Sequence, residues 1–117
     1  MALQVGIDTI AVTITSGTSL SQQVNLGAKA LHGIAMPAGW DAASLTFQAS
    51  VDGGATWLEM FSAGAVVNYA VAAGQYIAFD PALWRAVNAI KVRSGTSGVP
   101  VNQTADRALG LIVKGIN

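Results

Sequence analysis

The sequence predicts a single all-β domain, a β-sandwich of the jelly-roll type with about eight or nine short strands and one short helical turn. Two observations predict this fold class. Apolar and polar residues alternate with a period of two along most of the chain, as they do in half-buried strands. Gly, Pro, Asn and Asp recur between the alternating segments and predict turns. The 117 residues, 52% of them hydrophobic, suffice for one domain with one core.

The alternating segments predict the strands in chain order. In the first segment Ile10, Val12 and Ile14 share one face, and threonines are among the residues between them. The second segment alternates more weakly, and the third is stopped by Pro37 and Gly39. The segments read "DTIAVTIT", "SLSQQVNL", "ALHGIAM", "SLTFQASV", "TWLEMF", "AVVNYAV", "QYIAFD", "NAIKVRS" and "ALGLIVKG".

The segment "SLTFQASV" has the clearest alternation and predicts both faces of its strand. The residues predicted to face the core are Leu45, Phe47, Ala49 and Val51. Those predicted to face outward are Thr46, Gln48 and Ser50. "TWLEMF" is predicted to pair with this strand across an Asp-Gly-Gly-Ala turn, with Glu59 pointing outward.

One segment, "DPALWRAVN" at residues 80–88, predicts a short helical turn. Asp80 can cap its first turn, and Pro81 suits the first helical position. Between the last two predicted strands lies "GTSGVPVNQTAD", residues 95–106, which is long for a hairpin loop. Long loops in compact domains tend to be functional or to contact a partner.

The charge content restricts the function. Charged residues make up only 10% of the chain, against about 25% in typical soluble proteins. One interpretation is an Ala-rich β domain with a Ser, Thr and Gln surface. The other, which the composition favours, is a surface largely covered by copies of itself or by a partner. The formal net charge is zero, so we expect no nucleic-acid partner.

Several other classes are excluded or disfavoured. There is no cysteine, hence no disulfide, thiol catalysis or cysteine metal site. No export signal and no apolar run long enough to cross a bilayer is evident, so we expect no membrane association. Lys91 and Arg93 are two residues apart and are expected to form an ordinary solvated face of a strand.

The stretch "SVDGGATW" has the spacing Ser50-x-Asp52-x-Gly54-x-Thr56-Trp57 and resembles the Asp-box of sialidases and other sugar-active β-propellers. A single copy in so short a chain does not make a propeller. Asp at a hairpin turn accepts backbone N–H bonds, and glycine supplies positive φ. We therefore expect these residues to form a structural turn.

Catalytic constellations are not evident. Sialidase-like sites need clustered arginines, and this chain has only Arg85, Arg93 and Arg107. Glycosidases need two carboxylates at a set separation, and turns or caps account for most of the six here. With one histidine, His32, and no Gly-x-Ser-x-Gly motif, neither a catalytic triad nor a transition-metal site is expected. We expect a protein that is not an enzyme and has no metal or cofactor.

Two longer resemblances bear on function. "LTFQASVDGGATWLEMF" with "QYIAFDPALWRAVNAIKVRSG" is similar to the core of galactose-binding-like jelly rolls, over residues 45–95. That resemblance implies a carbohydrate-binding adhesion module and a surface glycan as partner. Such modules place exposed aromatic rings beside amides or carboxylates, a role open to Trp57 with Asp52 or Trp40 with Asp41.

The second resemblance covers most of the chain, from about Ile10 to Val113. "SLSQQVNLGAKALHGIAMPAGWDAASLTFQASVDG" and "RSGTSGVPVNQTADRALGLIV" resemble small structural proteins of tailed bacteriophages and prophages. This implies a virion component, made in the host cytoplasm and present in many copies or as a homo-oligomer. Low charge and small side chains favour a capsid decoration or "cement" protein on the outer shell, bound to the major capsid protein. A tail, neck or baseplate component is the alternative.

The partner interface is expected in two places. One is the uncharged arm "MALQVGI", residues 1–7, with Leu3 and Val5, which forms either the first strand or a tether onto a neighbour. The other is the long loop, whose interface residues are Val99, Pro100, Val101 and Asn102. The alternative is that the two valines fold back onto the sandwich. Trp40 and Trp84 are expected in the core, with interface anchoring as the other reading.

Overall fold

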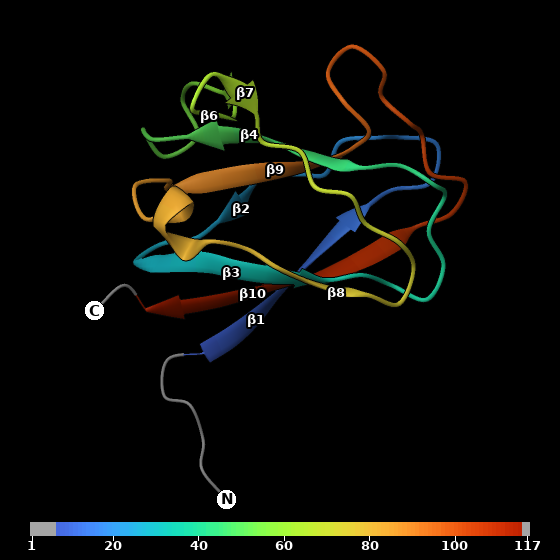
Figure 1. The fold of residues 1–117 in the computed structure, drawn as a ribbon, viewed down its shortest axis with the longest axis horizontal. Helices are drawn as coiled ribbons and strands as arrows, with labels where there is room; N and C mark the ends of the chain where they lie inside the picture. The colour runs from blue at the N-terminus through green and yellow to red at the C-terminus, as the bar shows by residue number, and fades with distance from the viewer. Residues whose placement is uncertain (1–6, 116–117) are drawn as a thin grey trace, which may run out of the picture.

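The computed structural model describes residues 7–115 and confirms an all-β domain, a sandwich of two sheets (Figure 1). Ten strands are present in the described residues, together with one short 3₁₀ helix, η1. The strands are β1 (Ile7–Ile14), β2 (Val24–Asn25), β3 (Lys29–Ala35), β4 (Leu45–Ser50), β5 (Leu58–Glu59), β6 (Phe61–Ser62), β7 (Ala65–Val66), β8 (Tyr76–Ala78), β9 (Ala89–Ser94) and β10 (Arg107–Gly115), and η1 covers Pro81–Trp84.

The topology is that of a jelly roll. One four-stranded sheet has the order β1-β10-β3-β8, and the other has the order β2-β9-β4-β5. All these neighbours are antiparallel. The chain crosses between the sheets at nearly every connection, apart from the β4–β5 hairpin, which is how eight strands wind into a jelly roll. The hairpin β6–β7, which follows β5 and precedes β8 along the chain, forms a separate two-stranded sheet.

The core lies between the two sheets and confirms most of the predicted inward faces. Val12 and Ile14 of β1 are buried, and Ile10 packs against the core at its edge. Phe47 of β4 is fully buried among other aromatic rings. Its ring meets those of Tyr69, Phe79 and Trp84 edge to face at centroid distances of 6.1, 6.0 and 4.9 Å. Edge-to-face packing is a favoured geometry for aromatic pairs.

The outward face of β4 lies on the predicted side of the strand, but it is more covered than the sequence suggests. Thr46 and Ser50 are buried, because the Thr46 hydroxyl donates to the Gly95 carbonyl (2.7 Å) and Ser50 is enclosed by the following turn. Val51, predicted in the core, is 67% exposed. The reason is that β4 ends at Ser50, so the alternation of the strand does not extend to Val51.

Arg93 was also placed wrongly. Lys91 and Arg93 do lie two residues apart on β9, but Arg93 is only 7% exposed and forms an ion pair with Glu59. A long, charged side chain is buried here because a carboxylate on β5 meets it.

Three other segments are shorter than the alternation predicts. "SLSQQVNL" contributes β2 alone, with an isolated bridge from Leu20 to Arg93. "AVVNYAV" supplies β7 and a bridge from Tyr69 to Leu45, while "QYIAFD" pairs with β3. The helical turn is confirmed as η1, with the Asp80 carboxylate accepting the Ala82 N–H at 3.1 Å. No helix of the described chain is long and apolar enough to cross a membrane.

Candidate partner-binding surfaces

The loop between β9 and β10 begins with a compact hairpin, visible as the orange excursion in Figure 1. The Thr96 N–H donates to the Val99 carbonyl (3.1 Å), and the Val101 N–H donates to the Ser94 carbonyl (2.9 Å). Gly95 has a φ of +87°, and a Cβ there would lie 2.5 Å from the Val99 carbonyl oxygen. Glycine is therefore required for this turn, which holds the tip in one conformation.

The residues of this loop that were predicted to form an interface differ in their exposure to solvent. Val99 is 70% exposed at the tip, and Pro100 and Asn102 are exposed as well. Val101 is half-buried. Val99 therefore does not fold back onto the sandwich, while Val101 is partly covered. The other predicted interface residues, Leu3 and Val5, lie outside the described residues.

At the base of the hairpin, the fully buried side chain of Gln103 ties the loops at this end of the sandwich together. The amide oxygen of Gln103 accepts the Asp41 N–H (2.8 Å) and the Arg107 Nε (3.1 Å). Its amide nitrogen donates to the Asp41 carbonyl (3.1 Å) and to Ser94 Oγ (2.7 Å). Two donors and two acceptor sites of the amide are thus all satisfied, which offsets the cost of burying it.

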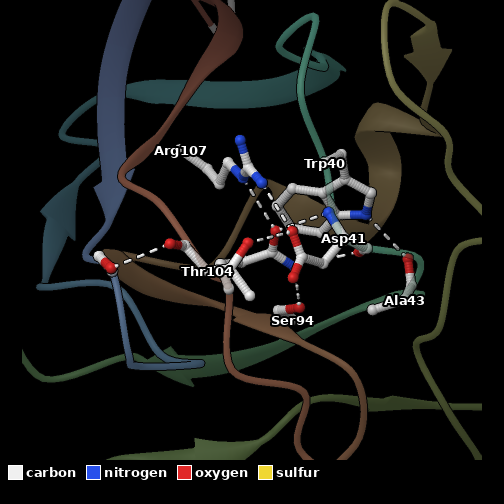
Figure 2. Close-up of polar contacts among 8 residues, drawn as sticks. Trp40, Asp41, Ala43, Ser94, Thr104 and Arg107 are labelled. Carbon is white, nitrogen blue, oxygen red and sulfur yellow. Dashed lines mark hydrogen bonds and ion pairs between the residues drawn. The ribbon is translucent and has the colours of Figure 1, made fainter.

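The same cluster contains an ion pair. Arg107 Nη2 lies 2.6 Å from Asp41 Oδ1, and the Thr104 hydroxyl donates to the same oxygen at 3.0 Å. The Arg107 guanidinium holds the pKa of the Asp41 carboxyl below its usual range. Trp40 is half-buried, packs against the core and donates its Nε1–H to the Ala43 carbonyl at 3.1 Å (Figure 2). These contacts hold the base of the exposed hairpin.

A second apolar surface lies beside β5 and β6 and was not foreseen from the sequence. Val51, Leu58 and Phe61 are large hydrophobic residues that are each more than 60% exposed. They surround a hollow of about 390 Å³ whose lining also includes Leu83 and Val87. The sequence shows an apolar residue at each of these positions, but the alternation of apolar and polar residues in "SLTFQASV" predicted that Val51 faces the core.

The Asp-box-like turn makes internal hydrogen bonds. The Ser50 hydroxyl donates to Asp52 Oδ1 (2.8 Å) and accepts the Gly54 N–H (2.8 Å), and Asp52 Oδ1 accepts the Thr56 N–H (2.9 Å). The bond from Ser50 is the main reason why the pKa of Asp52 is lowered. Trp57 is half-buried, with Lys91 Nζ 4.6 Å from its ring centroid. The side chains of Ser50 and Asp52 thus bond other residues of the same turn.

Most charged side chains of the described residues make ion pairs or hydrogen bonds with other residues of the same chain. The ion pairs join Lys29 to Asp8, Arg93 to Glu59, and Arg107 to Asp41. The aspartates that accept a backbone N–H outside these pairs are Asp52, Asp80 and Asp106. Several of these charged groups remain exposed at the surface, among them Asp8, Asp52, Asp80 and Asp106.

Between residues 7 and 115 no group of three or more His, Cys, Asp or Glu side chains could hold a metal ion. His32 lies half-buried in β3, with Nδ1 3.0 Å from the Ala30 carbonyl oxygen. No protein-family model matches the chain, and no curated protein sequence matches it significantly.

Proposed function

We propose that this protein is a structural component of a tailed-phage virion, a decoration or cement protein that binds the major capsid protein on the outside of the head. The observation that carries the proposal is the exposed valine at the tip of the ordered Gly95–Val101 hairpin. An apolar side chain gains little from facing water, whereas a partner pocket would bury it. Reinforcement of the shell follows if each copy contacts more than one capsid subunit.

The hairpin suits such a contact for an entropic reason. Its conformation is fixed by Gly95, Pro100 and the backbone bonds of the turn, so little freedom is lost when it is bound. The low surface charge and the exposed apolar residues near β5 agree with extensive coverage by other proteins. The resemblance to phage structural proteins supports the virion as the place of assembly.

The tryptophans favour assembly over sugar recognition. A sugar platform presents a flat, exposed ring beside polar groups that are free to bind the sugar. Trp84 is fully buried, Trp40 and Trp57 are half-buried, and Asp41 and Asp52 are both engaged by their own chain. The carbohydrate-binding alternative therefore has no support from these residues.

The test uses virions of a phage that encodes this chain. We expect mass spectrometry to find many copies per particle, and electron microscopy to place them on the head surface. Particles that lack the gene should accept added wild-type protein, while Val99→Ser should bind at least tenfold more weakly with an unchanged melting temperature.

Val66→Ser is the matched control, because Val66 is an exposed valine in a different hairpin. It should weaken binding less than Val99→Ser does, because Val66 is 37% exposed against 70% for Val99. Absence of the protein from purified virions would overturn the proposal. If electron microscopy places the protein only in the tail or neck, the capsid role is wrong and the protein is a tail or neck component.

A further inference from the structure

Strand β1 presents an open edge. Among the described residues it pairs with β10 and with no other strand, and it is the outermost strand of its sheet. The edge is eight residues long, contains no proline, and carries one charged residue, Asp8, which is paired with Lys29 at 3.1 Å. Soluble proteins usually protect edges of this length with prolines, inward-pointing charges or bulges, since an unprotected edge can pair with another chain.

One hydrogen bond identifies which backbone groups face outward. The Thr9 N–H donates to Asp8 Oδ1 at 2.8 Å, although Thr9 lies opposite Ile112 of β10. In an antiparallel ladder the bonding direction alternates from residue to residue. Ala11 and Thr13 therefore also direct their N–H and C=O groups toward the open edge. A hollow of about 310 Å³, lined by residues of β1 and by Gln22–Val24, leaves room beside them.

The sequence of this edge is complementary to itself. "TIAVT", residues 9–13, reads nearly the same in both directions about Ala11. In an antiparallel pair centred on Ala11, Thr9 lies opposite Thr13 of the second copy, and Ile10 lies opposite Val12. Cross-strand Thr–Thr pairs and pairs of β-branched residues stabilise sheets. The two Asp8 carboxylates fall at opposite ends of the ladder, so no like charges face each other.

We propose that two copies of this protein associate through their β1 edges, antiparallel and centred on Ala11, to form one continuous sheet with four strands from each copy. Ala11 N–H then donates to the Ala11 carbonyl of the second copy, and Thr13 N–H donates to its Thr9 carbonyl, each bond being repeated by the two-fold axis. The contact uses the same surface on both partners, as a closed dimer requires. It goes beyond the proposed virion role and holds whether or not that role is correct.

Charge-swap variants test the register. Two Ala11 side chains face each other across the axis, so Ala11→Lys and Ala11→Glu should each weaken self-association at least tenfold in sedimentation experiments on the full chain. An equimolar mixture of the two variants should restore the dimer. Ala108→Lys is the matched control, because Ala108 is exposed and lies opposite Thr13 on the neighbouring strand β10. It should dimerise like wild type.

Hydrogen exchange on the wild-type chain gives a second measurement that needs no variant. The Ala11 and Thr13 amides should become more protected as the protein concentration rises, while the exposed amides of the Gly95–Val101 hairpin should not. A wild-type chain that stays monomeric at millimolar concentration would overturn the proposal. So would a mixture of the folded Lys and Glu variants that fails to dimerise, since that excludes the Ala11-centred register.

Discussion

The guanidinium of Arg93 on β9 lies against the carboxylate of Glu59 on β5, and the ion pair spans the strand between them, β4. Arg93 Nη2 is 2.8 Å from Glu59 Oε2, and Nη1 also donates to the Thr46 hydroxyl at 3.3 Å. Arg93 is the more deeply buried partner, with 8% of its side chain exposed against 26% for Glu59. The pair therefore covers the outer face of the sheet near β4.

Removal of the carboxylate should destabilise the fold. Glu59→Gln leaves a buried guanidinium without its counter-charge, and we expect a loss of about 2–3 kcal/mol in the free energy of unfolding, somewhat below the value for a fully buried pair. Urea denaturation measures it. The control is the double variant Glu59→Met with Arg93→Met, which removes both charges and should recover part of the loss. If Glu59→Gln is as stable as wild type, solvent must hydrate the Arg93 guanidinium well enough to replace the carboxylate.

Acid should destabilise the protein through the same pair. Arg93 holds the pKa of Glu59 below its usual value near 4.5, chiefly by hydrogen bonding. A carboxyl with a lowered pKa binds fewer protons in the folded state than in the unfolded state, so its contribution is present above pH 4.5 and is lost as the pH falls through the folded pKa. Melting temperatures should be flat from neutral pH to about 5 and should decline below 4.5.

Glu59→Gln should show a shallower decline in acid than wild type, because its position 59 no longer titrates. The Asp41–Arg107 pair retains the same sign of pH dependence and accounts for part of the remaining slope. Parallel slopes in both proteins would show that Glu59 does not contribute.

The Asp-box-like turn should contribute to stability. Ser50→Ala removes the hydroxyl that bonds both Asp52 and the Gly54 N–H, and it should cost about 1–2 kcal/mol. Asp52→Ala should lower the melting temperature as well, because the Thr56 N–H loses its acceptor. Thermal melts check both variants. Unchanged melting combined with a loss of particle binding would assign the turn to function instead.

Two phenylalanines offer a matched test of the core. Phe47→Ala should cost about 3–5 kcal/mol, since it removes a fully buried ring and leaves a cavity. Phe61→Ala removes the same ring from a position that is 61% exposed and should change stability by less than about 1 kcal/mol. Chemical denaturation compares the two. Equal losses would show that the apolar surface beside β6 is packed in solution.

The buried amide below the exposed hairpin should be intolerant of substitution. Gln103→Met keeps the approximate size of the side chain but leaves the Asp41 N–H and Ser94 hydroxyl without their partner, at a cost of about 2–4 kcal/mol. Gln75→Met, at an exposed glutamine, should be neutral. Calorimetry distinguishes them, and similar melting of the two variants would show that water replaces the amide.

The sequence by itself determined the fold class, because strand alternation is a local property. The period of two in "DTIAVTIT" and "SLTFQASV" is imposed by which side of a pleated strand each residue occupies, so Val12, Ile14 and Phe47 could be assigned to the core correctly. The cap at Asp80 followed from the adjacent proline for the same local reason.

Only the tertiary structure decided the positions that depend on distant parts of the chain. Val51 is exposed because the strand stops one residue before it, and Arg93 is buried because Glu59 reaches it from another strand. Likewise, no local pattern shows that Gln103 meets Asp41 and Ser94, or that β1 lies at the edge of its sheet. Such features arise from how strands far apart in the sequence are placed side by side, which alternation within one segment does not encode.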